Sequence, residues 1–182
     1  GLLDNTVVVI YGDHDAKIKK SEYEYYYNYD FKTGGLLDVN DPDYHVVSDL
    51  EYEINRKVPL IIWTKDKSFK VKSSSVGGMI DVMPTLGNMF GITNKYALGH
   101  DLFSVIDNTV VFPDGNWLTN EMYYNSQKEE ALLLDSHYPI SVDYINERNE
   151  LAEEKISISN SIIVYDMIKS INDKMNMIKN GG

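Results

Sequence analysis

The sequence predicts an α/β fold with a mostly parallel central sheet flanked by helices. A β-branched run over residues 5–11 and an apolar run over residues 58–63 have strand length and are typical of strands buried on both faces of such a sheet. A helical apolar pattern covers residues 142–180, and a shorter helix is predicted over 81–90. The 182 residues contain no internal repeat and no low-complexity linker, so we expect one domain.

The first predicted strand, residues 5–11, is followed at once by Gly12, Asp13 and His14. In open α/β sheets, ligands bind just outside the carboxyl ends of the strands. Glycine makes a sharp turn easy at this point, because it carries no β-carbon. The strand therefore predicts a functional site at its exit.

Residues 16–57 form an acidic, tyrosine-rich insert between the two strands. Five tyrosines crowd into residues 23–29, and the stretch from Asp13 to Glu53 holds eleven acidic residues against four lysines. We expect a long, mostly irregular surface excursion with one or two short elements. Loops of this length in compact domains are usually functional or mobile.

The predicted helix over residues 81–90 has Asp81 as its N-cap and Pro84 in its first turn, where an amide hydrogen has no partner within the helix. Gly91 is expected to end it as a C-terminal cap residue. Residues 107–112 and 117–124 predict two strands joined by a turn, giving a small antiparallel element. From residue 142 onward, a helix is expected to pack its apolar stripe on the domain.

Composition excludes several classes of function. With 28 acidic and 17 basic residues, the chain carries a net charge of −11, which argues against a nucleic-acid binder that coats phosphates. It has no cysteine, so disulfides, thiolate metal sites and cysteine nucleophiles are excluded. No apolar run approaches the roughly 20 residues that cross a bilayer, and no signal peptide is visible.

Asp13 and His14 are the candidate metal ligands. A carboxylate oxygen and an imidazole nitrogen at adjacent positions reach one cation if the backbone turns sharply, and this donor pair suits Mn²⁺, Zn²⁺ or Mg²⁺. In the alternative interpretation, Asp13 caps a turn and His14 faces solvent. Two ligands do not complete a site, because three or four are expected.

Other candidate binding or catalytic residues are supported less well by the sequence. The segment 38–43 superficially resembles a calcium loop, but Pro42 takes a ligand position and Asp43 replaces the required glycine, so a solvated acidic loop is the better interpretation. The tyrosine cluster fits either the edge of a sugar or lipid headgroup, or packing beneath the insert. The three remaining histidines are isolated and are interpreted as structural or exposed: His45, His100 and His137.

Residues 4–15 read Asp-Asn-Thr, then the first predicted strand, then Gly-Asp-His-Asp. This pattern resembles the "DNT–strand–GDH" signature of the alkaline phosphatase/sulfatase superfamily, in particular of its lipoteichoic acid synthase-like phosphoglycerol transferases. Residues 58–62 resemble its "VPLII" strand, and residues 81–92 its "D-x-x-PT-L" helix. Residues 98–115 resemble its "G-x-DLFS…VVF-x-x-G" segment, and the four motifs occur in the family's order. The tail, residues 157–169, resembles the closing helix more weakly.

The resemblance implies an alkaline-phosphatase-like fold and one divalent metal, commonly Mn²⁺ or Mg²⁺, held by Asp13 and His14. It implies transfer of glycerophosphate from a phosphatidylglycerol-type lipid, through a threonine nucleophile, to a cell-envelope polymer. The implied location is the outer face of the membrane of a low-GC bacterium, reached through upstream segments. The Asp-His pair also occurs in phosphoethanolamine transferases, whereas many arylsulfatases carry Asp-Asn on calcium, so His14 favours phosphoryl transfer.

In the family, the nucleophile, a glutamate ligand and the substrate-binding histidine and arginine precede the DNT strand. The chain begins at Gly1, just before that strand, so no catalytic nucleophile is assigned here. We expect residues 1–182 to be the C-terminal portion of a sulfatase-like catalytic domain, soluble and inactive by itself. The alternatives are a sulfatase or phosphodiesterase, and a non-catalytic module that binds a partner or a cell-wall polymer.

Overall fold

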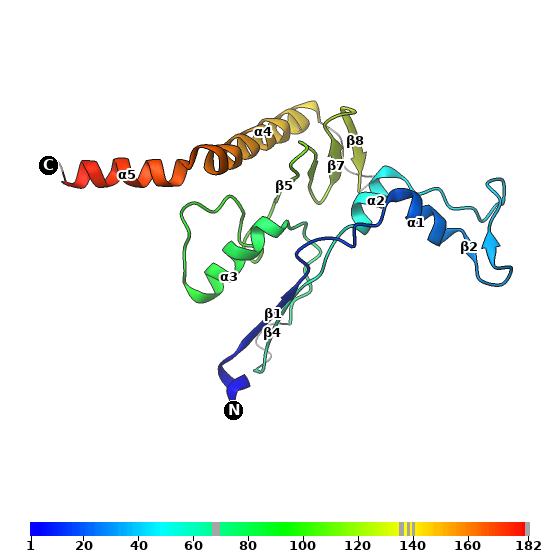
Figure 1. The fold of residues 1–182 in the computed structure, drawn as a ribbon, viewed down its shortest axis with the longest axis horizontal. Coiled ribbons are helices and arrows are strands. Elements are labelled where there is room, and N and C mark those ends of the chain that lie inside the picture. Colours follow the sequence, from blue (N-terminus) through cyan, green and yellow to red (C-terminus); the bar gives the residue numbers. More distant parts are fainter. Residues whose placement is uncertain (67–69, 135–136, 138, 140, 181–182) are drawn as a thin grey trace. The chain divides into compact units, whose positions relative to one another are not determined.

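Figure 1 shows the fold in a computed structural model. The structure describes residues 1–66, 70–134, 137, 139 and 141–180. The chain divides into two compact units, Gly1–Lys72 (unit 1) and Ser73–Gly182 (unit 2). Each unit combines helices with strands, so the predicted α/β class is confirmed.

Two strands of unit 1, β1 (Val7–Tyr11) and β4 (Leu60–Thr64), form an antiparallel ladder in which Tyr11 lies opposite Leu60. The prediction of a mostly parallel sheet is wrong for the strands that the structure describes, since each of their pairings is antiparallel. An apolar β-branched run favours a strand because such side chains fit a pleated surface. It does not specify the direction of the partner strand.

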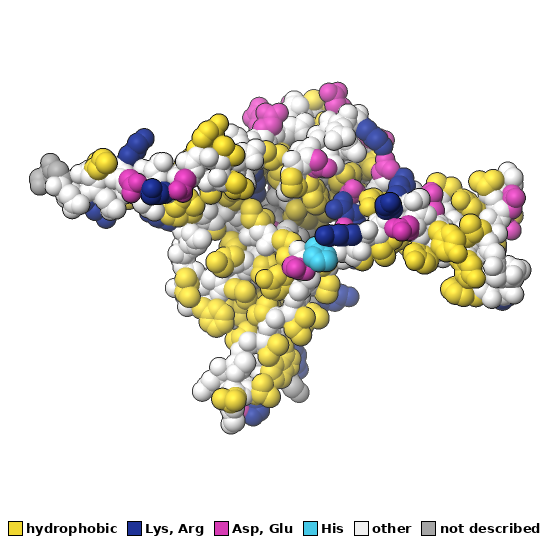
Figure 2. Space-filling view, viewed as in Figure 1, with side chains coloured by type: hydrophobic (Ala, Val, Ile, Leu, Met, Phe, Trp, Pro, Cys, Tyr) yellow, Lys and Arg dark blue, Asp and Glu magenta, His cyan; other side chains and the backbone are white. Residues whose placement is uncertain are grey.

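The faces of the β1–β4 ladder are partly exposed. Hydrophobic side chains gather along this pair (Figure 2), where Ile10 is 57 % exposed, Ile61 51 % and Trp63 42 %. Burial of β1 on both faces, which the apolar run predicted, is therefore not observed. A ladder of two strands leaves both faces open unless further elements cover them. A short 3₁₀ helix, η1 (Leu2–Asn5), precedes β1.

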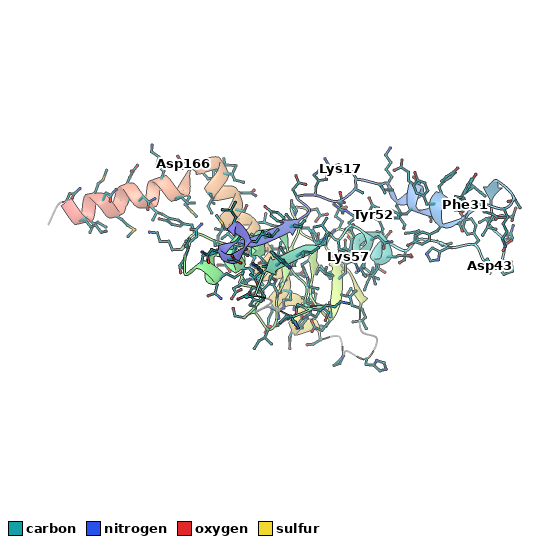
Figure 3. The ribbon with its side chains drawn as sticks, turned by 90° about the horizontal axis from the view of Figure 1, so that it is seen from below. Lys17, Phe31, Asp43, Tyr52, Lys57 and Asp166 are labelled. Atoms are coloured by element: carbon teal, nitrogen blue, oxygen red, sulfur yellow. The ribbon has the colours of Figure 1, made fainter. Side chains whose placement is uncertain are left out.

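The insert, which we call the tyrosine arm (residues 16–57), is more regular than predicted. It contains four short elements: α1 (Lys20–Tyr27), β2 (Tyr29–Asp30), β3 (Gly35–Leu36) and α2 (Asp49–Asn55). The rings of Tyr23 and Tyr52 meet edge to face with centroids 5.8 Å apart. Figure 3 shows Tyr52 on α2 and Phe31, which is 88 % exposed, further along the arm. Side-chain contacts therefore join α1 to α2, whereas the hairpin residue Phe31 is largely uncovered.

Unit 2 contains a four-stranded antiparallel sheet in the order β5-β6-β7-β8. Its strands are β5 (Val110–Val111), β6 (Trp117–Leu118), β7 (Met122–Asn125) and β8 (Glu130–Leu133). The predicted turn after β5 is confirmed: the amide of Phe112 donates to the carbonyl of Asn116 at 2.8 Å, and Gly115 adopts φ +88°. The predicted strand 117–124 is divided into β6 and β7 by a turn in which the Thr119 hydroxyl accepts the Met122 amide.

Helix α3 (Val82–Phe90) agrees with the predicted helix, and a 3₁₀ turn, η2 (Met79–Asp81), leads into it. Gly91 ends α3 in the left-handed conformation, with φ +68°, as expected of a C-terminal glycine. Asp81 occupies the N-cap position, but its carboxylate does not cap the helix. It accepts bonds from the amides of Gly78 and His100 instead. The carboxylate therefore ties the surrounding loops together.

The C-terminal helical segment consists of α4 (Val142–Tyr165) and α5 (Met167–Asn180), separated at Asp166, whose φ is +46°. The single continuous helix that the pattern predicted is therefore broken. Ala152 of α4 packs against the core of the sheet, which is formed by Trp117, Met122 and Tyr124. The predicted packing of the helix on the domain is confirmed for this half.

The described helices were compared with the length and hydropathy that a bilayer span requires. None of them is both long and apolar enough to cross a membrane.

Candidate metal centre

The turn after β1 depends on glycine. The amide of Gly12 donates to the carbonyl of Pro59 at 3.4 Å, which extends the β1–β4 pairing by one step. A β-carbon added to Gly12 would lie 2.8 Å from the Cβ of Val58, closer than side chains approach one another. The chain therefore passes close to its neighbour here before Asp13 and His14 project from the turn.

The two predicted ligands face each other. Nε2 of His14 lies 3.6 Å from Oδ1 of Asp13. Metal–ligand bonds of roughly 2.1 Å in a tetrahedral arrangement place two ligand atoms about 3.4 Å apart. The pair therefore fits one cation with little movement. Both side chains are accessible, with 60 % of the His14 side chain and 85 % of the Asp13 side chain exposed.

A hydrogen bond holds the His14 ring. Its Nδ1 lies 2.6 Å from the backbone carbonyl oxygen of Asp15, and a carbonyl only accepts, so Nδ1 carries the proton. Nε2 of the neutral ring therefore keeps its lone pair on the side of Asp13. Metal-binding histidines commonly donate their other ring nitrogen in this way. The bond to Asp15, followed by the charge of Asp13, raises the pKa of His14.

Asp15 is itself fixed by a residue from the end of α2. Nε of Arg56 donates to the Asp15 carboxylate at 2.5 Å, and the amide of Lys17 donates to the same carboxylate at 3.1 Å. Arg56 also pairs with Glu53 at 2.8 Å. The bond from Arg56 lowers the pKa of Asp15. Asp15 and Arg56 were not singled out from the sequence, although Arg56 is one of two arginines among 17 basic residues.

Asp13 and His14 have no third ligand beside them in the described part of the chain. No three His, Asp or Glu residues there lie close enough together to hold one metal ion. His45 instead pairs with Glu51, its Nε2 lying 2.8 Å from Oε1. His100 and His137 are exposed residues of unit 2. The carboxylate and the imidazole fit two coordination positions of one divalent cation. The assignment of Asp13 and His14 as metal ligands stays a prediction.

The acidic segment 38–43 closes on itself. The carboxylate of Asp38 accepts the backbone and side-chain amides of Asn40, both at 2.9 Å, and these bonds lower the pKa of Asp38. The carboxylate of Asp41 accepts the amide of Asp43 at 2.9 Å. These contacts form local turns, as the interpretation of a solvated acidic loop expects.

The tyrosines of the arm contact one another and also remain exposed. Tyr25 meets Tyr26 with ring centroids 5.6 Å apart, and the rings of Tyr27 and His45 lie tilted to each other with centroids 4.7 Å apart. Tyr26 is nevertheless 65 % exposed. Both interpretations of the cluster, packing and binding, therefore remain open.

An Asp-His pair at the exit of β1, in a chain of the α/β class, fits the phosphotransferase relatives that the motifs indicated. The chain is 30 % identical over 178 residues to lipoteichoic acid synthase 1 of Bacillus subtilis (strain 168). The similarity covers 93 % of the chain and 24 % of the synthase, so the chain spans about a quarter of the length of this curated relative. No family model matches the chain. The chain is thus similar in sequence to lipoteichoic acid synthase 1 over most of its own length, as its motifs predicted.

Proposed function

We propose that the chain is the C-terminal portion of the catalytic domain of a metal-dependent phosphoglycerol transferase. Asp13 and His14 supply two ligands to one divalent cation, Mn²⁺ or Mg²⁺, and Zn²⁺ also suits this donor pair. The observation that carries the proposal is the ring of His14, held through Nδ1 by the carbonyl of Asp15 with Nε2 3.6 Å from the Asp13 carboxylate. Similarity to lipoteichoic acid synthase 1 over 93 % of the chain supports the reaction class.

A divalent cation at this position supplies charge that neutralises phosphoryl oxygens and activates a hydroxyl nucleophile. The chain's own residues have simpler tasks. Asp13 provides an anionic oxygen, His14 provides a neutral nitrogen of fixed tautomer, and Asp15 keeps the ring from turning. The threonine nucleophile and the remaining ligands are proposed to belong to residues that precede the β1 strand. We therefore expect the 182-residue chain alone to be catalytically inactive and to bind metal weakly.

The proposed donor is an anionic phospholipid of the phosphatidylglycerol type, and the proposed acceptor is a cell-envelope polymer. Both follow from the reaction class, because the lipid carries the glycerophosphate group that is transferred. The proposed location is the extracellular face of the membrane, where such a polymer is built.

A second candidate, from another class, is a non-catalytic binding module. The exposed Tyr26 of the arm favours it, because a tyrosine offers a partner an apolar ring and a polar hydroxyl. Within the enzyme class, a sulfatase or phosphodiesterase and a phosphoethanolamine transferase share the same superfamily. The presence of histidine rather than asparagine at position 14 supports a phosphoryl-transfer enzyme among these.

Titration with Mn²⁺ tests the ligand assignment, and turnover tests the reaction. The binding isotherm of the 182-residue chain is compared with those of Asp13→Ala, His14→Ala and the double variant. We expect each single variant to weaken binding, and His100→Ala, an exposed histidine elsewhere, to leave it unchanged. If the double variant and the wild type bind Mn²⁺ with equal affinity, Asp13 and His14 are not metal ligands.

The reaction is tested on the full-length gene product with a fluorescent phosphatidylglycerol. Release of diacylglycerol that depends on Asp13 and His14 supports the transferase. Normal release from an Asp13→Ala/His14→Ala double variant would contradict it, as would cleavage of a sulfate ester with the lipid left intact.

A further inference from the structure

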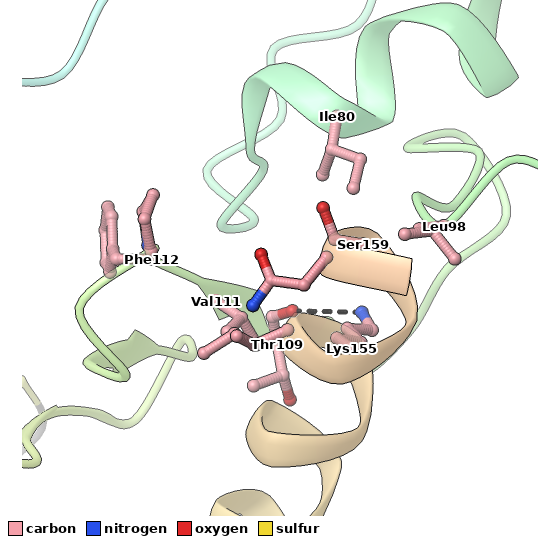
Figure 4. A pocket seen from close by; sticks show the side chains of 10 residues that line it. Ile80, Leu98, Thr109, Val111, Phe112, Lys155 and Ser159 are labelled. Carbon is pink, nitrogen blue, oxygen red and sulfur yellow. Dashed lines mark hydrogen bonds between the residues drawn. The ribbon is translucent and has the colours of Figure 1, made fainter. Parts of the chain in front are cut away.

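A small pocket lies in unit 2 between β5 and α4, and we call it the β5–α4 pocket. It encloses about 180 Å³ and is open on one side. Its apolar walls come from Ile80, Leu98, Val111 and Ile156. Figure 4 shows Ile80, Leu98 and Val111 near Lys155 and Ser159 of α4. A cavity of similar size in another protein holds benzene, so the volume suits a small molecule.

Lys155 is the charged group of this pocket. Its ammonium makes one hydrogen bond within the described part of the chain, a long one of 3.4 Å to the backbone carbonyl of Thr109. An ammonium has three donors, so two of them lack a protein acceptor. No carboxylate lies within ion-pair distance of Lys155 in that part of the chain. Burial lowers the pKa of Lys155, while the charge of Asp81 raises it and that of Arg148 lowers it.

Two further polar side chains line the same pocket. Ser159 follows Lys155 by four residues and so lies on the same face of α4, and the next residue, Asn160, also lines the pocket. Neither side chain has a hydrogen-bond partner among the residues that the structure describes. A hydroxyl, an amide and an ammonium therefore offer several unused donors beside an apolar wall. Lys155 and Ser159 are partly exposed and Asn160 is exposed, so water reaches them, and a bound anion would replace that water. The buried hydroxyl of Thr109 also lines the pocket and has no hydrogen-bond partner among the described residues, although buried polar groups are normally satisfied.

We propose that the β5–α4 pocket binds a small oxyanion with a short aliphatic body, a carboxylate or a phosphate monoester. The anion would accept hydrogen bonds from Lys155, Ser159 and Asn160, and the aliphatic part would cover Ile80 and Val111. Charge-assisted bonds to an ammonium are stronger than those between neutral groups, so the charge supplies most of the selectivity. The site uses residues of unit 2 alone and does not depend on the Asp13–His14 pair.

The experiment uses the folded 182-residue chain and three probes of equal chain length: butyl phosphate, butyrate and butanol. Binding is followed by ¹⁵N–¹H NMR, with the amides of Thr109, Val111 and Ser159 as local reporters. We expect butyl phosphate or butyrate to bind saturably with a dissociation constant of about 1 mM, as suits so small a ligand. Butanol should bind at least about tenfold more weakly, because it lacks the charge.

Lys155→Met keeps an unbranched side chain of similar length and removes its charge. We expect it to weaken binding of the anionic probe by about tenfold, whereas Lys174→Met, at an exposed lysine of α5, leaves binding unchanged. Ser159→Ala provides a second variant that retains Lys155 and should weaken binding less.

The relative binding of the two anions identifies which oxyanion the pocket prefers. The proposal is overturned if butanol binds as well as the anions, if neither anion shifts the reporter amides, or if Lys155→Met binds like the wild type. The first and second results are measured on the wild-type chain, so they hold even if a variant fails to fold.

Discussion

The guanidinium of Arg56 and the carboxylate of Asp15, 41 residues apart in the sequence, lie 2.5 Å from each other. Arg56 follows α2 at the end of the tyrosine arm, and Asp15 precedes the arm. The carbonyl of Asp15 holds the ring of His14. The Arg56–Asp15 ion pair therefore links the C-terminal end of the arm to a proposed metal ligand. Arg56 is a positioning residue in this arrangement, since it does not touch the metal position.

The first prediction concerns this ion pair. Arg56→Ala frees the Asp15 turn and lets the His14 ring rotate, so Mn²⁺ affinity should fall by about tenfold, the lower range for loss of an outer partner of a metal ligand. Arg56→Lys keeps the positive charge and should restore part of the affinity. Isothermal titration of the three proteins measures the effect.

Arg148→Ala serves as the matched control, because it removes the other arginine, which pairs with Asp107 in unit 2. Its Mn²⁺ affinity should equal that of the wild type. Unchanged affinity in Arg56→Ala would mean that the ring of His14 is fixed without the ion pair.

The second prediction concerns Gly12. Alanine at this position places a β-carbon 2.8 Å from the Cβ of Val58, so the backbone must shift. We expect Gly12→Ala to lower the free energy of unfolding by about 1–3 kcal/mol, the usual cost of overpacking. Urea denaturation followed by circular dichroism measures this change.

Val58→Gly removes the atoms that the new β-carbon would meet. In the Gly12→Ala/Val58→Gly double variant, the loss should therefore be smaller than the sum of the two single losses. Additive losses would show that the contact with Val58 is not the reason for glycine at this position.

The third prediction concerns the core of unit 2. The indole nitrogen of Trp117, a fully buried residue, donates to Oδ1 of Asn149 on α4 at 2.8 Å. Asn149→Ala leaves this donor unsatisfied and should cost about 1–3 kcal/mol in the free energy of unfolding. Asn149→Asp keeps an acceptor and should cost less. Thermal and urea unfolding compare the variants, and equal stability of the alanine and aspartate proteins would contradict the account.

The fourth prediction concerns the titration of Lys155. Burial disfavours its ammonium form, so its pKa should lie below the ordinary lysine value of 10.5, with Asp81 limiting the decrease. A bound oxyanion favours the charged form and should raise the pKa again. Reciprocally, anion affinity should fall as pH rises through the pKa of Lys155.

The ¹³Cε shift of Lys155, followed with and without butyl phosphate, measures this pKa. Lys174 on α5 is the exposed comparison and should not respond to the ligand. A Lys155 pKa that the ligand leaves in place would argue against contact between the ammonium and the anion.

Local features of this fold were predictable from sequence, and long-range ones were not. Helix α3 was predicted because Asp81, Pro84 and Gly91 mark its ends within one short stretch. Asp13 and His14 were identified because adjacent residues share one turn. The antiparallel direction of β1 and β4 was missed, since an apolar β-branched run favours a strand without specifying the orientation of its partner.

The same limit applies to the contacts around the site. No local pattern relates Arg56 to Asp15, and the pair forms only after the arm folds back on itself. The break between α4 and α5 was also missed, because Asp166 adopts φ +46° without a glycine or proline to mark it. Aspartate tolerates this left-handed conformation better than most residues, but it does not signal it strongly.

The opposition of Tyr11 and Leu60 has a consequence for how such chains diversify. The chain leaves β1 at Tyr11 and enters β4 at Leu60, which are paired with each other. Both ends of the arm are therefore anchored by the same two strands. The entropic cost of closing a loop rises only slowly with its length, so a longer or shorter arm would change the stability little. An arm of another size or surface chemistry can therefore replace this one and leave the turn with the two neighbouring donors in shape, provided that it retains an arginine in the place of Arg56 to bind Asp15.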